Sequence, residues 1–147
     1  RSFNYAFQED DGSLHAGAVP QLTFTRISTA PFEALGARVT PIRLLHGRFE
    51  VLGFRFGNVA YCTDTNKIPD ESWALLEGLD LLVLDALRPK PHATHFSLDE
   101  AIATAERVRP RRTLFTHMSH ELDHETTLAK LPKGMELAYD GLKAPLT

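Results

Sequence analysis

Cysteine is nearly absent from this sequence, and so are long apolar runs. The one cysteine, Cys62, has no second cysteine for an intrachain disulfide, so the chain shows no need for an oxidising compartment. The longest apolar run, residues 79–87, is interrupted by Asp80 and Asp85 and falls well short of the ~18 to 20 residues that cross a bilayer. We therefore expect a soluble, cytoplasmic protein with no membrane partner.

The sequence also lacks an excess of positive charge. Its 16 Lys and Arg residues are balanced by 19 Asp and Glu residues, which gives a formal net charge of −3. We expect no broad electropositive surface for a nucleic-acid backbone, so a nucleic-acid partner is not implied. The first residues include no initiator Met, no basic n-region and no apolar h-region, so they are typical of a chain entered midway.

The first half of the chain is predicted to contain mostly strands. Residues 8–20 concentrate acids, Gly and Ser without periodicity, which predicts a surface loop. Three later segments are rich in β-formers or alternate apolar with polar residues, which predicts antiparallel or edge strands over residues 22–27, 39–45 and 49–56. Gly57-Asn58 is typical of a hairpin turn, and the apolar run 59–63 predicts a buried strand that ends at Asp64.

The second half alternates strands and helices, which implies an α/β layer architecture. Two helices have local start signals. One is Pro69 followed by the acids Asp70 and Glu71, and the other is the capping box of Ser97 and Glu100. We predict helices over residues 69–77, 101–108 and about 121–130. Buried or closing strands are predicted over residues 79–85, 113–116 and 135–139.

Polar side chains follow several predicted strands, where α/β folds build their sites: His46, Asp64, His95 and His117. Neutral imidazoles and a carboxylate suit borderline divalent ions such as Zn²⁺ or Mn²⁺, and a carboxylate can bridge two ions. A dinuclear hydrolytic centre is one interpretation. The alternative is structural, because a single His at a strand end is more often a hydrogen-bonded residue and an Asp there often caps a turn.

Three histidines also lie close together in the sequence, at His117, His120 and His124. Offsets of three and seven fit a metal-binding cluster, but they describe one face of a helix start equally well. The spacing by itself leaves both interpretations open.

A set of short motifs occurs in a fixed order along the chain: His46-Gly47, Gly53-Phe-Arg-Phe, Ala60-Tyr-Cys-Thr-Asp64, Pro91-His92-Ala-Thr-His95-Phe-Ser, Thr116-His117-Met-Ser-His120-Glu-Leu-Asp-His124 and Ala138-Tyr-Asp-Gly141. This set resembles the phosphoribosyl cyclic phosphate phosphodiesterase branch of the metallo-β-lactamase superfamily, the PhnP-like proteins. The resemblance covers nearly the whole chain. It implies an αββα sandwich of the α/β class and a metal-dependent phosphodiesterase that acts on a small cyclic phosphodiester.

The resemblance also implies roles for individual residues. His46 would bind one of two divalent ions, Zn²⁺ or Mn²⁺, Asp64 would bridge both, and His117 would bind the second. His95 matches the active-site histidine outside the metal shell, and it would act as general acid or transition-state stabiliser while a metal-bridging hydroxide attacks phosphorus.

Other residues have weaker assignments. In some members of the family, the histidine that matches His120 joins three cysteines to hold a structural zinc. Those cysteines are absent here, so His120 is either an orphan zinc ligand, without the cysteines that would complete the zinc site, or a hydrogen-bond donor to a residue that binds metal. Substrate contact and helix capping are the two interpretations for both His92 and His124. Cys62 is expected to pack on the apolar face of its strand rather than to act as a nucleophile.

One family motif is missing, because the signature His-x-His-x-Asp-His occurs nowhere in the sequence. We therefore expect residues 1–147 to be a single partial metallo-β-lactamase-like domain, which supplies the second sheet of the sandwich and only some of the first. Such a part would expose apolar sheet surface. A missing N-terminal segment, a second polypeptide or a homo-oligomer would have to complete the metal site.

Two rival functions remain. A tRNA-processing nuclease of the same superfamily would need a flexible basic arm, and no basic-rich insertion is present. A non-catalytic binding or scaffold domain could keep the fold after loss of the first metal motif.

Overall fold

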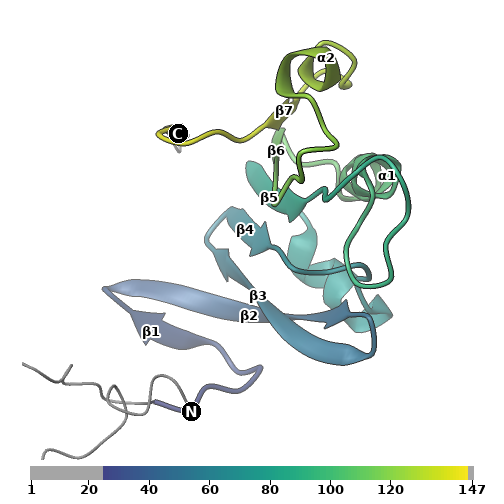
Figure 1. Cartoon of the computed structure of the whole chain (residues 1–147). Helices are drawn as coiled ribbons and strands as arrows, with labels where there is room; N and C mark the ends of the chain where they lie inside the picture. The colour runs from purple at the N-terminus through teal and green to yellow at the C-terminus, as the bar shows by residue number, and fades with distance from the viewer. Residues whose placement is uncertain (1–24, 146–147) are drawn as a thin grey trace, which may run out of the picture.

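The computed structural model describes residues 25–145, whose centre is one seven-stranded mixed sheet (Figure 1). Strands that are neighbours in the sheet are also neighbours in the chain. They are β1 (Phe32–Ala34), β2 (Ala37–His46), β3 (Phe49–Phe56), β4 (Val59–Cys62), β5 (Leu81–Asp85), β6 (Arg112–Thr116) and β7 (Met135–Leu137).

The first four strands pair antiparallel. β2 and β3 form a long hairpin in which His46 lies opposite Phe49, and Figure 1 shows this hairpin extending past the shorter strands. β3 continues into β4 through a turn at Gly57-Asn58, which confirms the predicted hairpin turn. The strands predicted over residues 39–45 and 49–56 are also confirmed.

The last four strands pair parallel, and a helix lies in each connection between them. These helices are η2 (Asp70–Leu76), α1 (Leu98–Val108) and α2 (His124–Leu128). Parallel pairing requires such crossovers, and it brings the carboxyl ends of β4, β5 and β6 to one edge of the sheet. The predicted α/β architecture is confirmed.

Side-chain caps determine where two of the helices begin. Ser97 and Glu100 form the predicted capping box at the start of α1, with the Ser97 N–H donating to Glu100 Oε2 at 2.8 Å. Asp123 caps α2, since its Oδ1 accepts a hydrogen bond from the Thr126 N–H at 2.9 Å. The helix predicted over residues 121–130 is therefore wrong at both ends, and only His124–Leu128 is helical.

Three further predictions differ from the structure. Residues 25–27 are irregular rather than a strand, while residues 22–24 and the loop 8–20 lie outside the described residues. The segment predicted as a helix over residues 69–77 is a 3₁₀ helix, because the Ser72 N–H bonds to Pro69 O in the i to i+3 pattern. The described strands form one sheet rather than parts of two, because β4 pairs with β3 on one side and with β5 on the other.

One face of the sheet is covered and holds the hydrophobic core. Side chains of β5 and β6 on this face pack in one cluster with side chains of η2 and α1; the members include Leu76, Leu82, Leu84, Ala101, Ala105 and Phe115. On the opposite face Phe54 lies across from Tyr61, and Phe56 and Tyr61 are 42% and 47% exposed. Among the described residues, the expected exposure of apolar sheet surface is therefore present.

Candidate metal centre

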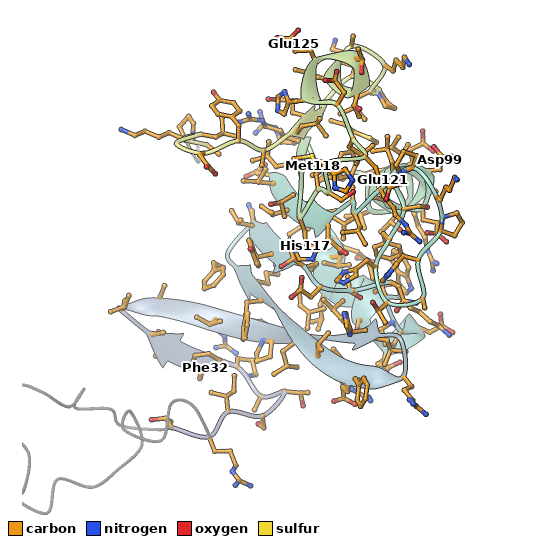
Figure 2. The ribbon with its side chains drawn as sticks, in the orientation of Figure 1. Phe32, Asp99, His117, Met118, Glu121 and Glu125 are labelled. Carbon is orange, nitrogen blue, oxygen red and sulfur yellow. The ribbon has the colours of Figure 1, made fainter. Side chains whose placement is uncertain are left out.

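Four of the predicted site residues lie together at one edge of the sheet. His46 is the last residue of β2, Asp64 and His117 follow β4 and β6, and His95 lies in the loop between β5 and α1. His46 Nε2 is 3.2 Å from His95 Nε2, and His117 Nδ1 is 3.4 Å from Asp64 Oδ1. The ring centroids of His95 and His117 are 4.8 Å apart. Figure 2 shows His117 at this point, below Met118.

Asp64 and His117 share a backbone conformation that is uncommon for residues other than Gly. Both are left-handed, with φ of 59° and 60°. This conformation costs of order 1 kcal/mol or more for each residue and persists only where the surroundings impose it. Because the two strained residues contact each other through their side chains, the strain is concentrated at the candidate centre, as is common in functional sites.

A fifth residue, Asp85, contacts the cluster from inside the protein. It is the last residue of β5 and is completely buried. Its Oδ2 lies 3.1 Å from His95 Nδ1, and its Oδ1 accepts a hydrogen bond from the Thr65 N–H at 3.3 Å. In the sequence Asp85 only interrupts the apolar run of residues 79–87, and its contact with His95 is not predictable because it depends on the fold of the loop between β5 and α1.

Burial determines the protonation of the Asp85–His95 pair. It raises the pKa of Asp85 to about 7, because the charged carboxylate loses its hydration. Burial also lowers the pKa of His95, and the neighbouring His117 and His46 lower it further. Both shifts favour the neutral form of each side chain, so a pair that is neutral overall is favoured just below pH 7. That pair holds one proton between Asp85 Oδ2 and His95 Nδ1 and a second on His95 Nε2.

The donor atoms fit a divalent metal ion. One oxygen of Asp64 and one nitrogen each of His95 and His117 all lie within 4.8 Å of one another. Metal bonds of about 2.0 to 2.2 Å hold two ligand atoms at most about 4 Å apart, and the 3.4 Å between Asp64 Oδ1 and His117 Nδ1 is within that limit. His46 adds a further nitrogen through its contact with His95. The group thus contains two of the three residues predicted to bind metal, and the third lies beside it.

The remaining histidines take different positions. His92 lies with its ring centroid 5.3 Å from that of His95, and its Nδ1 is 3.2 Å from Thr94 Oγ1. His120 is exposed and is not part of the Asp64, His95 and His117 group. Helix capping is the wrong interpretation for His92 and His124, because the N-caps of α1 and α2 are Ser97 and Asp123.

Cys62 lies in the hydrophobic core and is completely buried. Burial raises the pKa of its thiol to about 12, so the reactive thiolate is not populated near neutral pH. The expectation that this residue packs rather than reacts is consistent with its position.

A cavity of about 370 Å³ lies apart from the candidate centre, between α1 and the segment that contains α2, and it shares no lining residue with that centre. Asp99 and Glu121 both line it and are labelled near each other in Figure 2. Two of its three carboxylates have roles within the fold, because Glu121 pairs with Arg88 at 3.8 Å and Asp123 caps α2.

Comparison with known proteins identifies the family. Residues 1–118 match the model of the β-lactamase superfamily domain. A solved diphosphatase from the PhnP family is 48% identical, with a TM-score of 0.79 over 80% of this chain and 46% of that chain. The metallo-β-lactamase fold protein YhfI from Bacillus subtilis is 18% identical, with a TM-score of 0.67 over 88% of this chain and 57% of that chain, which shows the fold alone.

A curated protein of Porphyromonas gingivalis, an octanoyltransferase, is 34% identical over 116 residues, which make up 78% of this chain and 24% of that protein. The chain thus spans about a quarter of this relative and about half of the two solved structures. Within the described residues, no helix is long and apolar enough to span a membrane. Since the family model covers well over half of the chain, this chain belongs to the β-lactamase superfamily, as a PhnP-like protein with the metallo-β-lactamase fold.

Proposed function

We propose that this protein is a metal-dependent phosphodiesterase that hydrolyses a small cyclic phosphodiester. The observation that carries the proposal is the position of His95, whose ring contacts His46 through one nitrogen and the buried Asp85 through the other. The 48% identity to a PhnP-family diphosphatase supports a reaction at phosphorus.

Two divalent ions, Zn²⁺ or Mn²⁺, are the proposed cofactors: His46 would hold one, His117 would hold the other, and Asp64 would be a ligand of both. When bound, such ions neutralise charge on phosphoryl oxygens and lower the pKa of water. The chain contributes a fixed spacing of the ligands, because Asp64 and His117 are already 3.4 Å apart in strained backbone conformations.

His95 is the proposed general acid, which gives its Nε2 proton to the leaving alkoxide. Loss of this proton would leave an imidazolate anion unless Nδ1 gained a proton at the same time. Asp85 can supply that proton, because its Oδ2 lies 3.1 Å from Nδ1. The carboxylate that results remains bonded to the Nδ1–H of His95 and to the N–H of Thr65. Asp85 thus acts through His95 and does not contact the substrate.

His92 is the proposed substrate contact. The Thr94 N–H donates to its Nδ1 at 3.4 Å, so Nδ1 is the acceptor nitrogen and the proton of the neutral ring lies on Nε2. That Nε2–H is then available as a donor to a phosphoryl oxygen. For His120, an orphan zinc ligand and a hydrogen-bond donor both remain predictions.

A complete centre needs more ligands than this chain supplies, so we propose that a further segment or a second copy of the chain completes it. The exposed apolar face at Phe56 and Tyr61 is a surface on which such a partner would pack. With Asp64 on both ions, each ion would have two ligands from this chain, so a partner that supplies two more nitrogen or oxygen ligands per ion would bring each to the usual four.

The proposal is tested with the protein and its completing segment. Metal content is measured after reconstitution with Zn²⁺ or Mn²⁺, and hydrolysis is measured on a small cyclic phosphodiester and on a tRNA precursor. Asp64→Asn should abolish metal-dependent cleavage. Asp80→Asn is the matched control, since Asp80 lies before β5, at the opposite end of the strand from Asp85, and pairs with Arg111.

Different outcomes separate the three candidate functions. Cleavage of the cyclic diester that needs metal and Asp64 supports the proposal. Preferential cleavage of the tRNA precursor would replace it with the nuclease function. A complete protein that binds no divalent metal and cleaves neither substrate would refute it in favour of a non-catalytic domain.

A further inference from the structure

A three-residue segment after β4 holds several parts of the candidate centre together. Asp64 begins it, and Thr65, which is completely buried, follows. The Thr65 N–H donates to Asp85 Oδ1, and its Oγ1 donates to Leu45 O at 2.8 Å. Thr65 O in turn accepts from the Phe96 N–H at 2.9 Å. This segment is therefore tied to the residue before His46 and to the residue after His95.

The third residue, Asn66, reaches the other side of both histidines. Its Oδ1 accepts a hydrogen bond from the Gly47 N–H at 2.8 Å, and its Nδ2 donates to Ala93 O at 3.1 Å. Gly47 directly follows His46, and Ala93 precedes His95 by two residues. Because one partner is a donor and the other an acceptor, the orientation of the amide is fixed. A single planar amide thus joins the two loops that bring His46 and His95 to 3.2 Å.

These two loops are also in close contact next to Asn66. Gly47 is left-handed, with φ of 63°, and a Cβ atom added there would lie 3.1 Å from Thr94 Cγ2 and 3.4 Å from Ala93 O. Contacts of that length are tighter than ordinary van der Waals contacts, so an added Cβ would require Thr94 or the turn to shift by a few tenths of an ångström. The β2–β3 turn therefore packs closely against the loop between β5 and α1, and the amide of Asn66 is hydrogen-bonded to both.

We propose that Asn66 is a positioning residue that sets the distance between His46 and His95 through its hydrogen bonds to Gly47 and Ala93. The inference rests on the proposed function, in which His46 holds a metal ion and His95 donates a proton. Without the amide, each histidine keeps a backbone tie on one side, through Leu45 or Phe96, and loses the tie on the other. The two rings can then move apart without unfolding of the sheet.

The test uses the metal-free full chain and three variants. Asn66→Ala removes both hydrogen bonds, and Gly47→Ala pushes the turn away from Thr94 while it keeps Asn66. Ser72→Ala is the matched control, because it removes a different partly buried hydrogen bond, from Ser72 Oγ to Arg43 O at 2.7 Å. Long-range ¹H–¹⁵N spectra of the histidine rings report whether Nε2 of one ring donates to Nε2 of the other. Zn²⁺ affinity is measured by competition with a chelating dye.

We expect the paired Nε2 signals of His46 and His95 in the wild type and in Ser72→Ala, and their loss in Asn66→Ala and Gly47→Ala. Zn²⁺ binding should weaken about tenfold in Asn66→Ala, the low end for loss of a group that orients a ligand. Wild-type spectra and Zn²⁺ affinity in Asn66→Ala, with a loss of stability like that of Ser72→Ala, would overturn the inference. The spectra need no metal and no substrate, so they decide this role even if the proposed phosphodiesterase activity is absent.

Discussion

Replacement of Asp85 by Asn should stabilise the folded protein at alkaline pH, because it removes a buried group that resists ionisation. The pKa of Asp85 is raised from 3.8 to about 7, so the folded state binds this proton more tightly than the unfolded state does. The stability that Asp85 contributes is therefore fully present below about pH 4 and is lost as the pH rises through about 7. The difference between the two pKa values corresponds to at most about 4 kcal/mol, since His95 shares the titration.

The assay is urea unfolding at pH 5 and pH 8 in the presence of a chelator, followed by the fluorescence of Trp73, the one tryptophan of the chain. Asn at position 85 keeps an acceptor for the Thr65 N–H and gains a donor for His95 Nδ1. The free energy of unfolding of Asp85→Asn relative to wild type should therefore rise from pH 5 to pH 8. An equal difference at both pH values would refute the reasoning that burial of the carboxyl costs stability when it ionises.

The same variant should lose activity. Asn can bond to Nδ1 but has no proton to release to it, so transfer of the Nε2 proton would leave an imidazolate. We expect kcat to fall roughly 10²-fold or more, the usual contribution of general acid catalysis. Unchanged kcat together with the expected change in stability would show that His95 does not act as an acid supported by Asp85.

Three further predictions concern the fold. Leu84→Ala should lower the free energy of unfolding by about 2 to 5 kcal/mol, because Leu84 is completely buried in the core; a loss below about 1 kcal/mol in urea unfolding would contradict this. Ser97→Ala should cost about 1 kcal/mol by removing the cap of α1, whereas Ser97→Thr should keep most of it, as thermal unfolding would measure. Arg112 lowers the pKa of Glu136, so the stability from this pair is present above the unfolded pKa and is lost as the pH falls through the lower folded pKa. Glu136→Gln should therefore destabilise the protein more at pH 7 than in acid below the folded pKa; equal effects at both would exclude the ion pair as the cause.

Local sequence signals were sufficient for much of the fold. The hairpin turn at Gly57-Asn58 and the capping box of Ser97 and Glu100 were predictable because neighbouring residues form them. Helix lengths were less predictable. Residues 121–130 have a helical composition, yet the hydrogen bond of Asp123 to Thr126 starts the helix at His124. Such a cap competes with a longer helix, and the sequence pattern does not show which of them is formed.

The candidate site was likewise predictable from the sequence only in part. The sequence by itself placed His46, Asp64, His95 and His117 at or after strand ends, because alternation and apolar runs mark where strands stop. Only the tertiary structure shows that Asp85 contacts His95 Nδ1 and that Asn66 joins the loops of His46 and His95. It also shows that Asp64 and His117 have left-handed backbone conformations. These features depend on contacts between segments far apart in the chain, and on the burial that raises the pKa of Asp85. No local pattern encodes such contacts, since they exist only once parallel pairing has brought the strand ends to one edge of the sheet.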